Sequence, residues 1–222
     1  MSTAPVATDW DAYYRAPYKT ASVTRRITAS RLERTIRRFA PDAPAGLEIA
    51  EIGGANSCFY ERFRDNLKPA VYRVLDTNQL GLDLFAERFA GDCGSGRARG
   101  ELFDVLASVP PEAPKADVVF SVGLIEHFSQ ADTARAVRTH FELCRPGGLV
   151  LMTFPTPTVL YRAIRGLAEL TGQWIFHDER PLRAEEVLRA AAPFGEVLDT
   201  RVLWAIGLTQ GHAAFRAAGG DA

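Results

Sequence analysis

The chain has 222 residues, of which 47% are hydrophobic and 24% charged, and its formal net charge is −1 at pH 7. This length can bury one sizeable core, so a single domain over residues 1–222 is expected. The near-neutral charge gives no general attraction to polyanions, which excludes a wholesale RNA or DNA binder. No apolar signal segment or long apolar run is present, so we expect a cytoplasmic protein.

The three cysteines also restrict the class of protein. Cys58, Cys93 and Cys144 are odd in number, far apart and without C-x-x-C spacing. This pattern argues against both a disulfide framework and a zinc site, and favours reduced thiols.

The first forty residues are predicted to form a helical cap that ends near Phe39. Between Arg15 and Arg38 the cap has eight Lys or Arg and the single acid Glu33, which indicates either a solvated helix face or a surface for a phosphorylated or membrane-borne acceptor. Its aromatic residues could close over a ligand, or could pack the cap onto a sheet; they are Trp10, Tyr13, Tyr14 and Tyr18.

Two apolar runs then indicate a nucleoside-binding edge. Residues 47–52 read as a buried strand that breaks into a glycine turn, before a helix from about Phe59. Such a turn leaves backbone N–H groups free for a ligand. The next strand, 71–75, ends on Asp76, where a carboxylate can accept both hydroxyls of a ribose.

The glycine pattern argues against a dinucleotide. A G-x-G-x-x-G fingerprint would need glycine at Ala55 and Cys58, or at Asn56 and Phe59 in the other register. No Lys-Ser or Lys-Thr follows the turn either, so a P-loop and ATP chemistry are not expected.

The rest of the chain alternates between strand and helix. Residues 91–100, with four glycines, are expected to be a flexible connection. Helices are expected at 79–89, 131–144, 158–170 and 183–191, and strands near 98–102, at 117–121, 149–154, 196–204 and 211–217. The predicted fold is therefore an α/β, Rossmann-like doubly wound sheet of seven strands, mostly parallel with an antiparallel C-terminal hairpin. Its ligand should lie at the carboxyl ends of the strands.

The motif Glu51-x-Gly53-x-Ala55-x-Ser57 resembles the E/D-x-G-x-G-x-G motif of class I S-adenosylmethionine (SAM) dependent methyltransferases, with two glycines replaced. Further signals follow in that family's order over roughly residues 47–155. They are Asp76, Phe103-Asp104-Val105, the strand 116–121, Gly123-Leu124-Ile125-Glu126-His127-Phe128 and Arg145-Pro146-Gly147-Gly148. The Glu126-His127 pair resembles the "EH" turn of the ubiquinone and menaquinone biosynthesis branch. The C-terminal hairpin is also similar to that of the family.

The resemblance implies SAM as cofactor and S-adenosylhomocysteine (SAH) as product. Glu51 would engage the methionine amino group, Asp76 the ribose and Asp104 the adenine amino group, although Asp104 could be an ordinary turn residue. Ser57 could bond the carboxylate end or simply cap the helix. The expected cofactor contacts are Glu51, Gly53, Gly54, Ala55, Asn56, Ser57, Asp76, Thr77, Asn78, Asp104, Val105, Ser121, Val122 and Gly123.

Methyl transfer depends more on how the acceptor is positioned than on the strength of a catalytic acid or base, because a sulfonium methyl group is already activated. For an oxygen acceptor a base helps, and His127 and His177 are the candidates, although Glu126-His127 could simply orient its loop. The four histidines are widely separated and form no recognisable metal-ligand set, so no metal is expected.

Acceptor recognition is assigned to the cap (1–40) and to a lid at residues 155–181. The lid has an apolar helix, an aromatic segment at Trp174 and a polar run at Asp178, which indicate either an acceptor pocket or a packed helix with an exposed loop. The candidate acceptor contacts are Tyr14, Tyr18, Lys19, Trp174 and Asp178. Apolar surface here would favour a lipid-linked or aromatic acceptor. Weak contact with a membrane surface is a separate expectation, which goes with the basic residues of the cap.

Two hypotheses of function result. The first is a SAM-dependent methyltransferase that acts at an oxygen of a small or lipid-linked molecule. The second is a non-catalytic SAM-binding regulatory or scaffold domain, motivated by Ala55 and Ser57 at motif glycines. An open cofactor pocket beside an acceptor cavity would favour the enzyme, whereas a pocket filled by Tyr14, Tyr18 or Trp174 would favour the second hypothesis.

Overall fold

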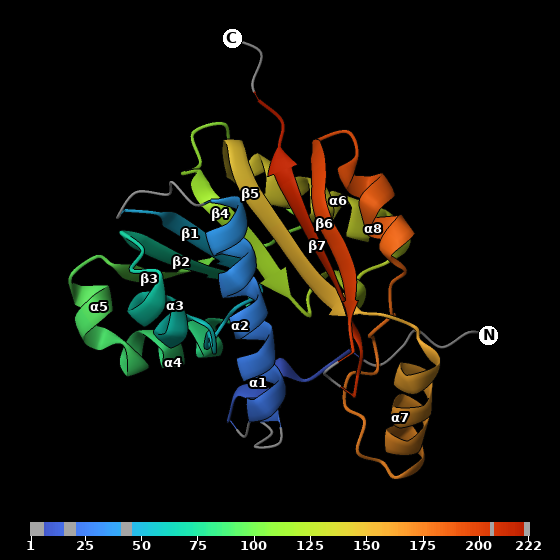
Figure 1. Cartoon of the computed structure of the whole chain (residues 1–222). Coiled ribbons are helices and arrows are strands. Elements are labelled where there is room, and N and C mark those ends of the chain that lie inside the picture. Colours follow the sequence, from blue (N-terminus) through green and yellow to red (C-terminus); the bar gives the residue numbers. More distant parts are fainter. Residues whose placement is uncertain (1–6, 16–20, 41–45, 205–206, 220–222) are drawn as a thin grey trace.

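The computed structural model describes residues 7–15, 21–40, 46–204 and 207–219, so Tyr18 and Lys19 lie outside the described residues. Its centre is a seven-stranded sheet in the order β3-β2-β1-β4-β5-β7-β6 (Figure 1). The strands are β1 (Glu48–Ile52), β2 (Val71–Asp76), β3 (Ala98–Leu102), β4 (Ala116–Val122), β5 (Cys144–Pro155), β6 (Gly195–Leu203) and β7 (Gln210–Ala217). β7 runs antiparallel to β5 and β6, and the other pairs are parallel. The predicted fold class is confirmed.

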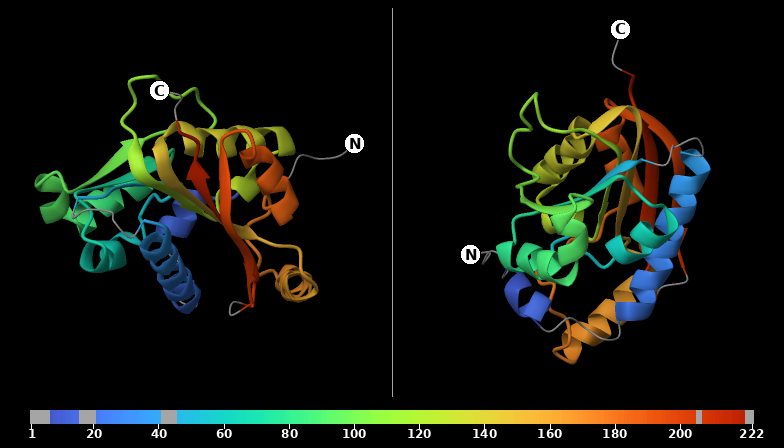
Figure 2. Two further views of the ribbon diagram at one scale, coloured as in Figure 1. Left: turned by 45° about the horizontal axis from the view of Figure 1, so that its top comes forward. Right: turned by 90° about the vertical axis from the view of Figure 1, so that its left-hand side faces the viewer.

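Helices cover both faces of the sheet (Figure 2). One face carries α2 (Ala21–Phe39), α3 (Tyr60–Asn66) and α4 (Gln79–Arg88), and the other carries α6 (Gln130–Glu142) and α8 (Ala184–Ala191). The remaining helices are α1 (Trp10–Arg15), α5 (Ala90–Gly94), the short 3-10 helix η1 (Ile125–His127) and α7 (Val159–Leu170). None of the described helices is long and apolar enough to cross a bilayer.

The strands β1, β2 and β4 are mainly apolar because they are buried on both faces of the sheet. Alternate residues of a strand point to opposite faces, so two separate cores form. Ile49 and Phe120 pack with Phe63 and Phe85 below the α3–α4 face. Val119 packs with α6 and α8 in the other core.

Two boundaries differ from the sequence expectation. The first residues of the connection expected at 91–100 belong to a short helix, α5. Asp92 of this helix forms ion pairs with Arg97 at 2.8 Å and Arg64 at 3.4 Å, which stabilise it. β5 begins at Cys144 and not at 149, since Cys144 already pairs with Ala116 of β4. The other predicted helices and strands are confirmed to within a few residues.

The parallel strands β1, β2 and β4 bring three chain turns to one edge of the sheet. The turn after β1 is tied to β2 by Gly53 N, which donates to Leu75 O at 2.7 Å. Likewise Gly123 N, after β4, donates to Thr153 O at 2.9 Å. Residues from three separate sequence motifs are therefore collected at the carboxyl edge, where α/β folds bind ligands.

Candidate functional site

The turn after β1 has the backbone that the glycine motif requires. Gly53 and Ala55 both have positive φ, +74° and +35°. A left-handed backbone is natural for glycine and strained for alanine. Gly53 also lies against Leu124, since a Cβ at this position would come within 2.8 Å of Leu124 Cδ1. The turn therefore adopts the glycine conformation although Ala55 replaces a motif glycine.

Glu51 is a buried carboxyl group beneath this turn. Tyr72 Oη donates to its Oε2 at 2.6 Å. Burial raises the pKa of Glu51 to about 7, against the opposing effect of hydrogen bonds from Ser57 and Tyr72. A Cβ on Gly54 would lie 2.5 Å from Glu51 Cδ, so the glycine is required for the close approach of the turn.

The Ser57 side chain bonds the backbone that leads into α3, whose N-cap residue is Phe59. Its Oγ accepts hydrogen bonds from the backbone N–H groups of Phe59 at 3.2 Å and Tyr60 at 3.1 Å. These bonds satisfy two of the amide groups that a helix start leaves without partners. Ser57 therefore holds the backbone before α3, while its contact with a cofactor stays a prediction.

Asp76 lies at the tip of β2, next to the same turn. Its Oδ1 accepts from Asn78 N at 2.8 Å, and the backbone of Ala55 also bonds to the carboxylate. Burial raises the pKa of Asp76, while these backbone bonds oppose the increase. Asn78 caps α4 by accepting from Gly81 N at 2.7 Å, whereas Thr77 is exposed.

The side-chain oxygen of Asn56 is a hydrogen-bond acceptor that no described donor satisfies. Its Oδ1 is buried and has no hydrogen-bond partner in the described part of the chain. A buried polar atom of this kind carries a desolvation penalty of about 1–3 kcal/mol unless a bound group or water satisfies it. The amide is therefore suited to meet a ligand at this turn.

The last two motif segments differ in how they present their side chains. Asp104 is exposed and accepts from Leu106 N at 2.8 Å in a local turn, while the side chain of Val105 is buried. Ser121 is fully buried, and its Oγ bonds His140 Nε2 at 2.8 Å on the α6 side of the sheet. The Ser121 hydroxyl is therefore engaged inside the protein, while the half-buried Val122 and Gly123 lie at the strand end.

Helix α1 covers this edge. Asn78 Nδ2 donates to Asp11 Oδ1 at 2.7 Å. Tyr14 is largely buried close to Asp76 and Glu51; burial and then the charge of Asp76 hold its pKa far above the ordinary value. Tyr14 of the cap thus lies near two of the residues expected to bind a cofactor.

His127 and Asp178 form a hydrogen-bonded pair beside α1. His127 Nδ1 lies 3.0 Å from Asp178 Oδ1, and Thr8 N and Oγ1 also donate to the carboxylate. These bonds and the imidazole lower the pKa of Asp178, although burial opposes them. An ionised carboxylate only accepts, so Nδ1 carries the proton and Nε2 has a free lone pair. Burial lowers the pKa of His127, which favours this neutral form.

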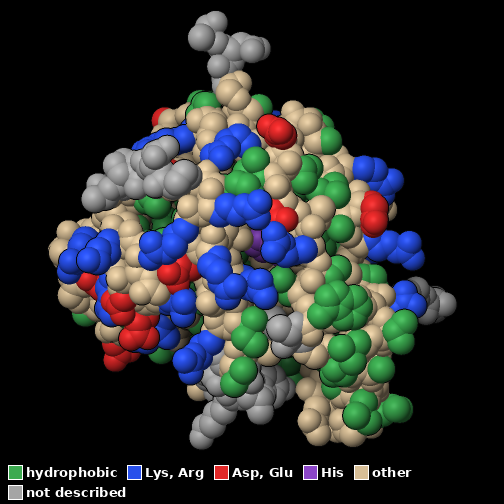
Figure 3. Space-filling model, in the orientation of Figure 1, with side chains coloured by type: hydrophobic (Ala, Val, Ile, Leu, Met, Phe, Trp, Pro, Cys, Tyr) green, Lys and Arg blue, Asp and Glu red, His purple; other side chains and the backbone are tan. Residues whose placement is uncertain are grey.

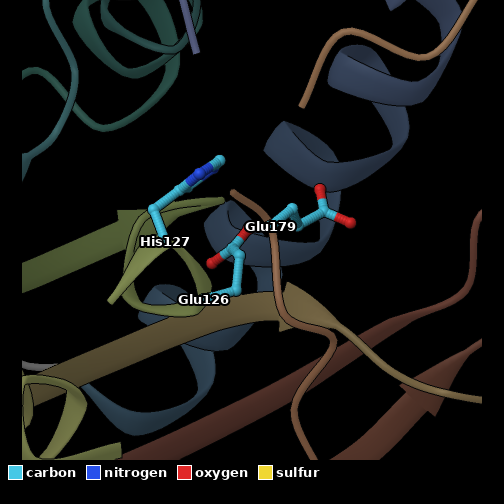
Figure 4. Close-up of side chains that lie close together, drawn as sticks. All are labelled: Glu126, His127 and Glu179. Atoms are coloured by element: carbon cyan, nitrogen blue, oxygen red, sulfur yellow. The ribbon is translucent and has the colours of Figure 1, made fainter. Parts of the chain in front are cut away.

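Two glutamates lie beside His127 (Figure 4). Ligand atoms of Glu126, His127 and Glu179 lie within 4.8 Å of one another, a spacing that could hold a metal ion. Glu126 is 1% exposed, and its Oε2 has no partner among the described residues. Burial and then the charge of Glu179 raise the pKa of Glu126 well above its ordinary value. A reading of the histidines alone missed this group, because two of its members are carboxylates.

Glu179 is already held by its own partners. Tyr161 Oη donates to Glu179 Oε1, and Arg165 NH1 lies 3.6 Å from the same oxygen. Trp174 is buried and packs edge-on against Tyr161, with ring centroids 6.4 Å apart. His177 is exposed, so the structure does not bring it into this group.

Sequence reasoning missed Tyr72 and Asp11. Tyr72 could have been noticed, because a tyrosine inside a fully buried strand needs a partner for its hydroxyl. Asp11 carries no such signal, since its bond to Asn78 joins segments far apart in the chain.

The fold of this chain is similar to that of known proteins. Residues 50–150 match the family model described as "Methyltransferase domain". Magnesium protoporphyrin IX methyltransferase (ChlM) from Synechocystis PCC 6803 with bound SAH superposes with a TM-score of 0.71 at 11% identity, over 94% of this chain and 93% of that one. The chain has the class I methyltransferase fold.

Other proteins share this methyltransferase fold. The N-methyltransferase NodS from Bradyrhizobium japonicum WM9, in complex with SAH, gives a TM-score of 0.61 at 14% identity, over 85% of this chain and 86% of that one. An O-methyltransferase family protein from Burkholderia thailandensis gives 0.64 at 13% identity, over 99% of this chain and 66% of that one. No curated protein sequence gives a significant match.

Proposed function

We propose that this protein is a SAM-dependent methyltransferase. The observation that carries the proposal is the joining of the positive-φ turn, buried Glu51 and strand-end Asp76 at one edge of the sheet. A carboxylate at each of two adjacent strand ends suits a ligand with an ammonium group and a ribose. The methyltransferase domain match and the neighbours bound to SAH support the same cofactor.

The residues present fit this cofactor. Glu51 would hold the methionine ammonium, and Asp76 the ribose hydroxyls. Asn56, with its buried acceptor unsatisfied, would receive a cofactor donor at the turn. Bound SAM supplies an activated methyl group, so the chain itself needs to position an acceptor in line with it.

The proposed acid–base residue is His127. Its Nε2 would take the proton of an acceptor hydroxyl, while Asp178 holds the ring orientation and tautomer from Nδ1. Asp178, first assigned to acceptor binding, therefore becomes a positioning residue. The Glu126-His127 turn resembles the ubiquinone-type branch, which favours oxygen as the accepting atom.

The acceptor would be a small or lipid-linked molecule. Tyr14 and Trp174 are proposed as walls of its pocket, one from the cap (1–40) and one from the lid (155–181) of a single domain. Tyr14 stacks on Trp10 with ring centroids 6.2 Å apart, and Trp174 packs edge-on against Phe176 at 5.7 Å. Trp10 and Phe176 in turn pack against the imidazole of His127 at 5.2 and 6.2 Å.

Calorimetric titration with SAH tests the cofactor. Wild type should bind with a Kd near 1 μM, roughly −8 kcal/mol, and Asp76→Ala should lose this binding. Asp83→Ala, an exposed aspartate of α4, is the matched control and should bind like wild type. If wild type fails to bind SAH, or Asp76→Ala binds as tightly, the proposed site is wrong.

A second function, a non-catalytic SAM-binding domain, has one observation in its favour. Tyr14 lies close enough to Asp76 and Glu51 for their charges to raise its pKa, so its side chain approaches the residues proposed to bind the cofactor. Methyl-labelled SAM and a panel of phenols and lipid-linked quinol precursors separate the two functions. Labelled product supports the enzyme, whereas tight SAH binding without product for any acceptor supports the binding domain.

A further inference from the structure

Helix α7 presents its apolar side chains to solvent. Val159 and Leu170 are 86% and 88% exposed, Leu167 is 64% exposed and Leu160 41%, while Tyr161 on the opposite side is buried. At the helical repeat these four residues fall within one stripe of about 100°, the width that usually faces a core. A contiguous apolar stripe of this kind marks an interaction surface.

An exposed tryptophan lies in the chain segment beside this helix. Trp204 follows β6 and is 62% exposed. The β6–β7 hairpin end contacts α7, because a Cβ on Gly207 would lie 3.1 Å from Ile164 Cδ1. Thr158 Oγ1 and Thr209 Oγ1 are 2.6 Å apart at the same junction. We define Val159, Leu160, Leu167, Leu170 and Trp204 as the α7 surface.

Unpaired positive charge accompanies the α7 surface. Helix α2 is joined to the same hairpin by Thr28, whose Oγ1 donates to Gln210 Oε1 at 3.0 Å. The exposed arginines 26, 34 and 38 of α2 and 162 of α7 have no ion-pair partner among the described residues. Figure 3 shows Lys and Arg side chains over α2 and hydrophobic side chains over α7 on one face of the molecule.

We propose that this face docks on an anionic lipid bilayer. The leucines and valine of α7 enter the boundary between head groups and acyl chains, Trp204 lies at the interface, and the arginines contact lipid phosphates. A second copy of the chain fits less well. A two-fold dimer pairs this face with itself, so the interface would contain the unpaired arginines of both copies.

The docking does not depend on methyl transfer, but it has a consequence if the proposed function holds. α7 is followed directly by Trp174 and Asp178, which pack beside the His127 group. An acceptor that resides in the membrane would then reach the proposed active site from the docked side. This consequence rests on the proposed function, whereas the docking itself is tested without SAM.

Co-sedimentation of the full chain with vesicles tests the docking. Wild type should pellet with vesicles of phosphatidylglycerol and phosphatidylcholine, and much less with phosphatidylcholine alone. Leu167→Glu/Leu170→Glu should lower the bound fraction at least tenfold, and Arg34→Glu/Arg38→Glu should lower it several-fold. The matched controls are Val197→Glu, an exposed valine at the other end of β6, and Arg189→Glu on α8; both should bind like wild type.

The outcomes separate the alternatives. Circular dichroism spectra and urea unfolding of the α7 variants that match wild type show that the fold is intact, and loss of vesicle binding then supports the docking. Wild type that stays in the supernatant with anionic vesicles overturns the proposal. A second result also overturns it: light scattering shows that wild type is a dimer, Leu167→Glu/Leu170→Glu dissociates this dimer, and the same variant still binds vesicles like wild type. Failure of SAH to bind wild type affects only the proposed function.

Discussion

Asp178 and His127, 51 residues apart in the sequence, meet at 3.0 Å with the imidazole Nδ1 facing the carboxylate. The pairing leaves Nε2 as the basic atom. It also joins the turn after β4 to the lid, so the proposed base and its positioning residue come from different motifs.

We expect Asp178→Asn to lower kcat about 100-fold if His127 acts as the base. An asparagine amide can donate to Nδ1, which would move the imidazole proton to Nε2 and remove the free lone pair. The KM for SAM should stay unchanged. Steady-state kinetics over pH check this, with Asp83→Asn as control; equal kcat for Asp178→Asn and wild type would contradict the role of the pair.

SAH affinity should depend on pH through Glu51. Burial raises its pKa to about 7, and a cationic ammonium prefers the ionised carboxylate, so affinity should rise about tenfold between about pH 6 and 8. Glu51→Gln should flatten this dependence. Calorimetry across this range measures it, and a wild-type profile as flat as that of Glu51→Gln would contradict the role of Glu51.

Folding stability should show the opposite trend. A pKa raised from 4.5 to about 7 favours the protonated folded state, so the contribution of Glu51 to the free energy of unfolding is fully present below about pH 4.5 and is lost as pH rises to about 7. The full change attributable to Glu51 is about 3 kcal/mol. Urea unfolding of both proteins between about pH 4 and 8 measures this contribution. The free energy of unfolding of wild type minus that of Glu51→Gln should fall by this amount as pH rises to about 7.

Release of α1 from the site should increase the affinity for SAH. The hydrogen bond between Asp11 and Asn78 holds α1 over the site, so Asp11→Ala should raise SAH affinity about fivefold, equivalent to about 1 kcal/mol. Trp10 packs against His127, and its fluorescence should change on SAH binding in wild type and not in Trp10→Phe. Weaker SAH binding by Asp11→Ala would show that α1 forms part of the bound site.

Position 55 should tolerate glycine and reject valine. Ala55→Gly relieves the positive φ but loses a buried methyl group, so stability should stay within about 1 kcal/mol of wild type. Ala55→Val places a branched side chain at φ +35° in a fully buried position and should destabilise by about 2 kcal/mol or more. Thermal unfolding measures both; a valine variant as stable as wild type would contradict this backbone.

The group of Glu126, His127 and Glu179 should work without a metal. Burial and the charge of Glu179 favour a protonated Glu126, and Glu179 is satisfied by Tyr161 and Arg165. Dialysis against EDTA should leave the methyl-transfer rate unchanged. A lost rate that Mg²⁺, Mn²⁺ or Zn²⁺ restores would assign the group to a metal ion.

Local patterns in the sequence predicted the strands along the chain and the edge at which a ligand is expected to bind. Buried parallel strands read as apolar runs, and Gly53 and Asp76 stand where such runs stop, so both could be predicted without long-range information. The same patterns could not say where side chains turn within a strand buried on both faces. Ser121 accordingly bonds His140 and does not reach the edge.

Only the tertiary structure decided which distant residues meet. The pairs His127 with Asp178, Glu51 with Tyr72 and Asn78 with Asp11 each join different elements, and no periodicity in the chain reports such contacts. The apolar residues of α7 were visible in the sequence as a helical stripe. The stripe faces outward because Tyr161, on the opposite side of α7, is buried against Trp174. The sequence does not show this contact.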